Sequence, residues 1–219
     1  MEFAVKFDNV VADELQEKVS FAVTGRCMTA AVTARQEENE LLVRLMLGLA
    51  RPLSGEIALL GEDVCAASEK ALNALRRKVA VVYPTGGLIS NLKVWENLVL
   101  PLEYFSVCPQ GEIEERGMSA LQRVGYAGGL MELPGHLSLY ARRQVGLARA
   151  MLLDPELVIY DEILAGLSGD QRDAITGVME TFHRESPGRS SLFLTANKDA
   201  VREIAVEARI AIKGSSLHD

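Results

Sequence analysis

Residues 27–49 constrain the fold more than any other part of the sequence. They read CMTAAVTARQEENELLVRLMLGL, an apolar strand that leads through a short polar loop into a strongly apolar helix. This layout is typical of a phosphate-binding loop, in which backbone amides at the start of the helix receive phosphate groups. Such a loop also needs glycines for close approach, a lysine for the phosphates and a hydroxyl for Mg²⁺. None of these three occupies its position here.

Three glutamates, Glu37, Glu38 and Glu40, instead bring negative charge to the place where phosphates would bind. A carboxylate within ~4 Å of a phosphate adds a repulsion of roughly 1 kcal/mol in water, and more in a partly closed cleft. The segment therefore predicts the scaffold of a nucleotide site without its chemistry. Two alternatives remain open: a solvated helix start, where acids are favoured by the helix dipole, and a site for a cation or a basic protein segment.

Composition narrows the class of protein. A chain of 219 residues with 48% hydrophobic and 24% charged residues is the size of one α/β domain with its own core. The net charge of −7 argues against nucleic acid or an anionic membrane surface as the main partner. Its three well-separated cysteines suggest reduced thiols. No apolar run approaches the ~20 residues of a membrane span, and the start lacks the pattern of a signal peptide. We therefore expect membrane association only through another subunit.

Strands and helices alternate along most of the chain, which predicts a mainly parallel sheet with crossover helices. The first two strands, 2–9 and 18–23, predict an antiparallel ribbon. Residues 86–150 predict a helical insert, and Arg142 and Arg143 in it are expected on a solvated helix face. The other expected elements are strands at 56–60, 78–83, 157–160, 191–195 and 208–212, helices at 68–77, 138–153, 170–185 and 198–205, and turns at 51–55 and 61–63.

Several segments in this order resemble the nucleotide-binding subunit of ABC transporters. The resemblance spans nearly the whole chain and rests on phrases such as ARPLSGEIALLGEDV, LRRKVAVVY and ARRQVGLARAMLLDPELVIYDE. The phrase GGLISNLKVWENLVLPL is most similar to the subunits of MCE-type (Mla-like) bacterial lipid transporters. The resemblance implies a P-loop NTPase-like ABC ATPase fold over residues 1–219, with a parallel core, an N-terminal antiparallel ribbon and a helical insert. It also implies a sandwich of two subunits, in which ATP is held by the phosphate loop of one and covered by the signature helix of the other.

The nucleotide-contacting positions of that family are altered in this chain. In the phosphate loop, Asn39 stands in the position of the lysine and Glu40 in that of the Mg²⁺-binding serine. Leu41 replaces a hydroxyl residue, and Gln36 and Glu38 replace glycines. Loss of the lysine alone would remove the main counter-charge to the phosphates. The resemblance therefore implies that nucleotide binding in the usual way is not expected.

The other family positions differ as well. Pro84 replaces the glutamine that contacts Mg²⁺ and the attacking water, and Ala196 replaces the histidine that senses the γ-phosphate. In the signature, Ser138 is kept, whereas Leu139 and Tyr140 replace glycines. The connection at 10–17 has no aromatic residue to stack on adenine, and Ser168 occupies the position of a coupling aspartate.

Two acidic family positions are kept, Asp161 and Glu162. In the family they hold Mg²⁺ through water and polarise the attacking water. They are either a surviving base and metal partner or vestigial residues at a strand end; because catalytic groups act as a unit, we favour the vestigial interpretation. Neither a nucleotide nor a metal is then expected, and Mg²⁺ at Asp161 belongs only to the alternative. Leu88, Leu92 and Trp95 form either a groove for a membrane subunit or ordinary core packing.

These observations predict a catalytically silent ABC subunit with a structural or regulatory role in a membrane transport complex. Its expected partners are a permease and either an active ABC ATPase or a second copy of itself, at the inner face of the cytoplasmic membrane. One alternative is a subunit that binds or hydrolyses ATP weakly through Asp161 and Glu162 with residues of a partner. Another is a binding module that has left transport altogether.

Overall fold

The computed structural model describes residues 2–13, 15 and 17–212. Its first sheet has the strand order β2-β1-β4-β5, and all of its pairs are antiparallel. The predicted opening ribbon is confirmed, because β1 (Phe3–Val11) pairs with β2 (Val19–Thr24). On its other side, β1 pairs with β4 (Ser54–Leu59).

Both turns that we predicted beside β4 need correction. The strand already begins at Ser54, because its pairing with β1 continues as far as Val11. The expected turn at 61–63 contains β5 (Glu62–Asp63), which pairs with the end of β4. Leu60 and Gly61 both have positive φ, at 50° and 86°. Two such residues form the tight connection that matches the twist of a hairpin.

The second sheet is parallel throughout and has the strand order β6-β7-β8-β3-β9. This arrangement confirms the predicted parallel core. Strands β3, β6, β7 and β8 are largely buried on both faces, and their apolar side chains contribute to two hydrophobic clusters, whereas the edge strand β9 is only partly buried. Their bounds are β3 (Met28–Val32), β6 (Val79–Val82), β7 (Leu157–Asp161), β8 (Ser190–Thr195) and β9 (Ala208–Ala211).

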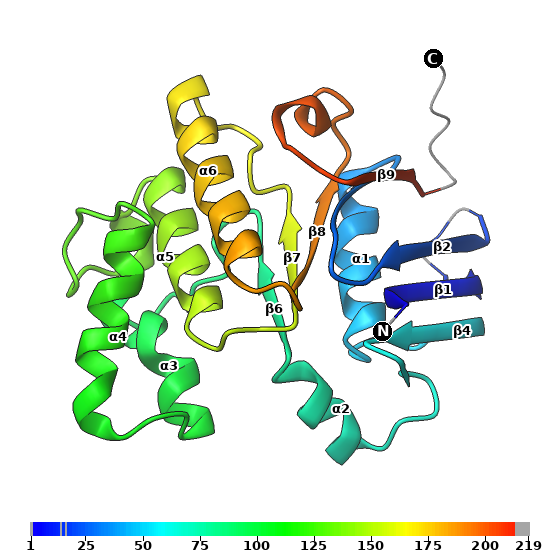
Figure 1. Cartoon of the computed structure of the whole chain (residues 1–219), viewed down its shortest axis with the longest axis horizontal. Coiled ribbons are helices and arrows are strands. Elements are labelled where there is room, and N and C mark those ends of the chain that lie inside the picture. Colours follow the sequence, from blue (N-terminus) through cyan, green and yellow to red (C-terminus); the bar gives the residue numbers. More distant parts are fainter. Residues whose placement is uncertain (1, 14, 16, 213–219) are drawn as a thin grey trace.

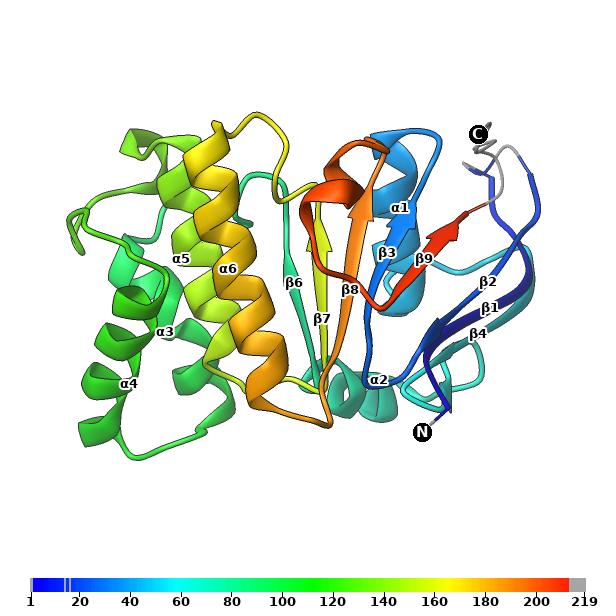
Figure 2. The same cartoon turned by 45° about the horizontal axis from the view of Figure 1, so that its top comes forward.

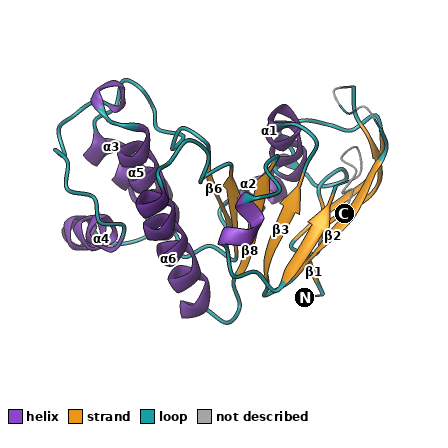
Figure 3. Cartoon of the chain, turned by 90° about the horizontal axis from the view of Figure 1, so that it is seen from above, coloured by secondary structure: helices purple, strands orange, loops and turns teal. Residues whose placement is uncertain are grey.

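Helices cover the two faces of this parallel sheet unequally (Figures 1 and 2). One helix, α1 (Gln36–Met46), lies between the parallel and the antiparallel sheet. The opposite face carries the larger group of helices, and Figure 3 shows from above how the sheet separates the two sides. That group consists of α3 (Val94–Phe105), α4 (Gln110–Arg123), α5 (Leu139–Met151) and α6 (Gly169–Glu185).

Two predicted helix starts are confirmed by their hydrogen bonds. The Ser68 hydroxyl accepts from the backbone N–H of Ala71 at the start of α2 (Glu69–Arg76). The Ser138 hydroxyl accepts in the same way from Ala141 at the start of α5, at 3.1 Å. A serine at this position satisfies one of the free amides of the first turn.

The helix predicted at 198–205 is wrong. The structure has only a short 3-10 helix there, η2 (Ala200–Glu203). The Asn197 side chain accepts from the backbone N–H of Asp199 at 2.9 Å, and such a local bond competes with helix formation. A second 3-10 helix, η1 (Pro134–His136), precedes α5. No helix in the described part of the chain is long and apolar enough to span a membrane.

Segment 84–87, which follows β6, packs directly on α5. Gly86 has a φ of +83°, and a Cβ there would lie 2.2 Å from the carbonyl oxygen of Arg142. A Cβ on Gly146 would in turn lie 2.4 Å from the carbonyl oxygen of Gly86. The Arg149 side chain donates to the carbonyls of Gly86 and Gly87, at 3.3 and 2.7 Å. The two glycines therefore let the segment lie against the helix backbone.

Candidate functional site

The candidate site lies where the carboxyl ends of β3, β7 and β8 meet the start of α1 (Figure 2). Parallel strands bring such ends to one edge of the sheet, where α/β proteins commonly bind ligands. Thr33 follows β3, Asp161 ends β7 and is followed by Glu162, and Thr195 ends β8. The Thr33 backbone N–H donates to the Thr195 carbonyl at 3.0 Å. This edge therefore collects residues from distant parts of the sequence.

Asn39, in the position of the family lysine, forms the centre of the site. Its side chain is completely buried. The side-chain oxygen Oδ1 accepts from Thr33 Oγ1 at 2.6 Å, which orients the amide. The side-chain nitrogen Nδ2 then donates to Asp161 Oδ1 at 3.1 Å and to Glu162 Oε1 at 3.4 Å. Asn39 therefore links the loop to both of the carboxylates that we predicted from the sequence.

Glu162 is hydrogen-bonded on both carboxylate oxygens and is only 5% exposed. Oε1 also accepts from the backbone N–H of Ala196, the residue in the position of the family histidine. Oε2 accepts from Thr195 Oγ1 at 3.0 Å. The backbone of Glu162 has a φ of 46°, in the left-handed region that non-glycine residues seldom adopt. The sharp turn after β7 directs this carboxylate toward β8.

Glu38 bends back onto the loop that precedes α1. Its Oε2 accepts from the backbone N–H of Ala34 at 3.3 Å, and its Oε1 accepts from Arg35 Nε at 3.3 Å. A loop amide of the kind that would receive a phosphate is thus bonded to a side chain of the same protein. Of the other loop positions predicted from the sequence, Gln36 and Glu40 are exposed, and Leu41 is buried in the core.

The electrostatics of the site make ionisation of Asp161 less favourable than in water. Burial raises the pKa of Asp161 to about 6; the hydrogen bond from Asn39 lowers it, and the charges of Glu162 and Glu40 raise it further. Burial also raises the pKa of nearby Tyr83, followed by the charges of Asp161 and Glu40. In both cases the main cause is burial, which removes the ionised form from water.

The Pro84 position is connected to α5 by an arginine. The Pro84 carbonyl accepts from Arg143 Nε at 2.7 Å. Arg143 is only 2% exposed, so our prediction of a solvated face is wrong for this residue. Arg142 is partly buried. The prediction fails because α5 is enclosed by neighbouring helices and by segment 84–87 on most of its circumference.

The altered signature residues pack within their own chain. Leu139 and Tyr140 are partly buried against the core cluster that the large group of helices shares with the sheet. Leu139 lies next to Gly166, with Cδ2 3.5 Å from the place that a Cβ on this glycine would take. Ser138 is exposed and serves as the helix cap described above. These side chains fill the surface where glycines would leave room for a ligand.

The three residues predicted to receive a partner are all partly exposed and lie around the start of α3. The Trp95 ring packs on α4, where a Cβ on Gly117 would lie 2.8 Å from it. Leu88 and Trp95 both pack against the buried core. Their contact with a partner remains a prediction.

Four residues of the site were not predicted from the sequence as site residues: Thr33, Thr195, Tyr83 and Arg143. The two threonines could have been found, because each directly ends or follows a buried strand of the parallel sheet. Tyr83 offered the same signal after β6. Arg143 offered none, since its burial depends on how α5 packs in three dimensions.

The chemistry of the site is that of neutral donors bonded to acidic acceptors. The donors to the carboxylate pair are the amide of Asn39, the hydroxyl of Thr195 and the backbone of Ala196. In residues 2–13, 15 and 17–212, no three His, Cys, Asp or Glu side chains converge as metal ligands. The arrangement stabilises the meeting of three strands and a helix start.

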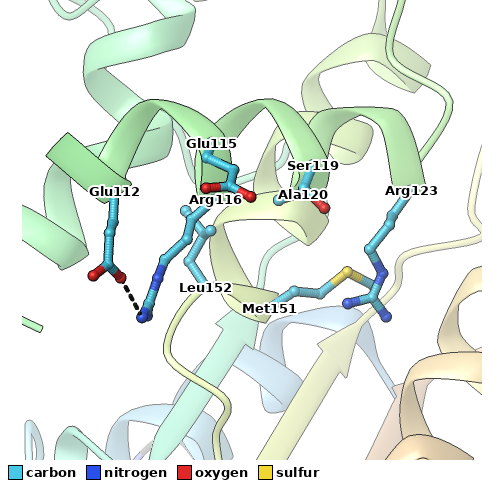
Figure 4. Close-up of a pocket in the computed structure, with 8 residues that line it drawn as sticks. All are labelled: Glu112, Glu115, Arg116, Ser119, Ala120, Arg123, Met151 and Leu152. Carbon is cyan, nitrogen blue, oxygen red and sulfur yellow. Dashed lines mark hydrogen bonds and ion pairs between the residues drawn. The ribbon is translucent and has the colours of Figure 1, made fainter. Parts of the chain in front are cut away.

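A separate hollow of about 460 Å³ lies between α4 and the end of α5 (Figure 4). One of its edges is an ion pair between Glu112 and Arg116, at 2.9 Å. Arg123, at the other end of α4, is paired with Glu185 at 2.5 Å. None of the site residues lines this hollow, so it is not part of the candidate site.

Comparison with known proteins identifies the family. The family model described as "ABC transporter" matches residues 41–165, more than half of the chain. The chain belongs to the ABC transporter family. Within this ABC chain, the match begins at Leu41, the last of the altered loop positions. It covers β4 to β7 and the helices between them, whereas β3 and the loop before Leu41 lie outside it.

Solved ABC structures share the fold. A dimeric post-hydrolysis state of the ATP-binding cassette MJ0796 bound to ADP and Pi gives a TM-score of 0.82 at 19% identity, covering 95% of this chain and 94% of that one. A second structure, of cbiO1 from Clostridium perfringens, gives a TM-score of 0.77 at 20% identity over 97% of this chain and 86% of that one. Both likenesses confirm the predicted ABC ATPase fold.

Curated relatives come from more than one transport system. The methionine import ATP-binding protein MetN of Rhizobium meliloti is 29% identical over 90% of this chain and 55% of its own length. The intermembrane phospholipid transport system ATP-binding protein MlaF of Haemophilus influenzae is 27% identical over 93% of this chain and 75% of its own length. The chain spans about half the length of its methionine-import relatives.

Proposed function

We propose that this ABC chain is a catalytically silent subunit with a structural or regulatory role in a membrane transport complex. The observation that carries the proposal is the Asn39 amide, which replaces the lysine and donates to both Asp161 and Glu162. A lysine at this position would offer a positive charge to phosphates. Asn39 offers no charge, and its hydrogen bonds are used within the protein.

The residues at the site do not fit a nucleotide with Mg²⁺. A loop amide, that of Ala34, is bonded to the carboxylate of Glu38, and Glu40 adds a charge beside Asp161. Phosphate groups would have to displace Glu38 and approach Glu40, and each such contact is repulsive. On the opposite surface, Leu139 and Tyr140 fill the place of the signature glycines. In a sandwich with another ABC subunit, neither surface of this chain would suit ATP.

The partners that we propose are a permease and either an active ABC ATPase or a second copy of this chain. The lipid-transport assignment is supported by the similarity of segment 86–102 to MCE-type subunits and by the MlaF relative. The methionine-import relatives keep the transported substrate open. Such partners would hold the chain at the inner face of the cytoplasmic membrane.

An apolar groove beside the edge strand β6 supports docking on a membrane subunit. It has a volume of about 310 Å³, and its rim carries Tyr104, whose side chain is 77% exposed. An apolar helix in such a groove is a common recognition mode. The groove lies on the same helix as Trp95, near the predicted partner surface. It is lined by Ala80, Val81, Leu100, Pro101, Tyr104, Phe105, Arg149, Ala150 and Leu153.

Nucleotide titration tests catalytic silence directly. A fluorescent ATP analogue is added to the purified chain with and without Mg²⁺, and we expect no saturable binding at concentrations up to about 1 mM, a threshold near −4 kcal/mol. Saturable submillimolar binding would overturn the proposal. The variant Asp161→Asn serves as the matched control, because it keeps the side-chain shape and removes the charge.

Copurification tests the proposed setting. The tagged chain is isolated with its membrane fraction from the native host, and we expect a permease or another ABC subunit to accompany it. The variant Tyr104→Glu places a charge on the rim of the groove and should reduce the permease recovered. Recovery of neither partner by the unmodified chain would contradict a role in transport.

A second candidate function is weak ATP binding or hydrolysis through Asp161 and Glu162. Two observations favour it: both acidic family positions are kept, and the curated relatives are named ATP-binding proteins. Residues of an active partner would then have to complete the site. In the titration above, this function requires Mg²⁺-dependent binding that Asp161→Asn abolishes.

A further inference from the structure

Arg143 is a buried cation whose bonding is incomplete. Its side chain is 2% exposed and extends from α5 to the carboxyl end of β6. Nε donates to the Pro84 carbonyl, whereas the buried Nη1 has no hydrogen-bond partner among the described residues. A guanidinium removed from water needs a compensating negative charge to be tolerated. Pro84 supplies a neutral acceptor, so this charge must come from elsewhere.

The source of that charge is Glu162, which directly follows the adjacent strand β7. Strands β6 and β7 pair in parallel, with Val82 beside Tyr160. Pro84 follows β6 and Glu162 follows β7, so both residues lie at the carboxyl edge of the parallel sheet. Arg143, bonded to Pro84, therefore lies at the same edge as Glu162.

The pKa of Arg143 responds to the charge of Glu162. Burial lowers the pKa of Arg143 to about 10, the charge of Glu162 acts in the opposite direction, and the neighbouring Arg142 lowers the pKa slightly more. The guanidinium therefore stays positive at neutral pH. The hydrogen bonds to Glu162 come from neutral groups, so Arg143 contributes the positive charge that these donors lack.

We propose that Arg143 is a built-in counter-cation of Glu162, the second residue of the acidic pair. This inference rests on the proposed catalytic silence, because it explains how the acidic pair is accommodated by a site that does not fit Mg²⁺. Arg143 is then a positioning residue: it balances the charge of Glu162 from the α5 side, while Asn39 donates a hydrogen bond to Glu162 from the α1 side. Arg143 also connects α5 to the site, and this connection needs no bound nucleotide.

A simpler role must be distinguished, in which Arg143 only ties α5 to segment 84–87 through its bond to Pro84. Both roles predict that Arg143→Gln is less stable. Only the counter-cation role predicts that neutralising Glu162 compensates for the loss of Arg143. A double-mutant cycle isolates this coupling.

The cycle compares the unmodified chain with Arg143→Gln, Glu162→Gln and the double variant, with Arg142→Gln as the matched control on the same helix. Melting temperatures are measured at low ionic strength. We expect Arg143→Gln to lower the melting temperature by about 5 °C or more, and the double variant to recover at least half of this loss. Arg142→Gln should show no coupling to Glu162→Gln.

Added MgCl2, at constant ionic strength, gives a second readout. In Arg143→Gln, Glu162 lacks its counter-cation, so millimolar Mg²⁺ should raise the melting temperature, whereas the unmodified chain should not respond. Additive effects in the cycle, or an Arg143→Gln variant that ignores Mg²⁺, would overturn the proposal. If Arg143→Gln does not fold, a folded double variant supports the inference and an unfolded one refutes it. No nucleotide is used, so the outcome is independent of the titration that tests catalytic silence.

Discussion

Asp161→Asn should make the protein more stable at neutral pH, although it removes one of the two acidic positions that the family keeps. In the folded chain Asp161 is 3% exposed, and burial raises its pKa from 3.8 to about 6. Asparagine keeps the oxygen that accepts from Asn39, and it removes a charge that Glu162 and Glu40 repel. The hydrogen bond survives while the cost of ionisation disappears.

The size of the effect follows from the pKa difference. Because the pKa rises from 3.8 to about 6, the unfolding free energy at pH 7 is lower than at acidic pH by about 3 kcal/mol, as an upper limit. The folded state binds the proton more tightly than the unfolded state, so this contribution is fully present below pH 3.8. It is lost as the pH rises through about 6. Asp161→Asn has no carboxyl group to ionise at this position, so it should not lose this stability as the pH rises.

Urea denaturation at pH 4, 5.5 and 7 measures the effect. The gain from Asp161→Asn should approach the upper limit at pH 7 and shrink toward zero at pH 4. The control is Asp173→Asn, an exposed residue on α6, which should change stability by less than about 0.5 kcal/mol at every pH. A variant that is equal to or less stable than the unmodified chain at pH 7 would refute the account of a strained, buried carboxylate.

Three further outcomes can be checked in the same way. Asn39→Ala should lower the unfolding free energy by about 2–3 kcal/mol in urea titrations, because it leaves buried acceptors without their donor; Gln36→Ala, on an exposed side chain, should be nearly neutral. Gly86→Ala should lower the melting temperature by at least about 4 °C, since its Cβ would meet the α5 backbone at 2.2 Å. Gly135→Ala, with nothing within 4 Å, should not. Ser138→Ala should cost about 1 kcal/mol and speed amide hydrogen exchange in the first turn of α5.

The parts of the fold that were predicted correctly have local causes. The run KVAVVY is β-branched and apolar throughout, which suits a strand buried on both faces, and β6 lies there. Ser68 and Ser138 each precede an amphipathic run, and both cap a helix. The helix expected at 198–205 failed because a single local bond, to Asn197, competes with it over a short stretch.

The sequence predicted which positions belong to the site, but not the hydrogen bonds between them. The altered loop identified Asn39, and the strand end identified Asp161 and Glu162. Their hydrogen bonds join residues more than 120 positions apart, and no local pattern reports such a pairing. The prediction of a solvated Arg143 failed for a related reason. A charged residue on a helix is usually solvated, and only the packing of α5 against segment 84–87 buries this one.

The hydrogen bonds of Glu38 and Asn39 have a consequence for the evolutionary history of the loop. A lysine introduced at position 39 alone would lie beside Asp161 and Glu162, and it would form an ion pair with them inside the protein. Removing Glu38 alone would free an amide without supplying a cation for the ligand. Each single reversion thus disturbs a satisfied network and restores no affinity. A return to nucleotide binding would therefore require several substitutions in the loop at once.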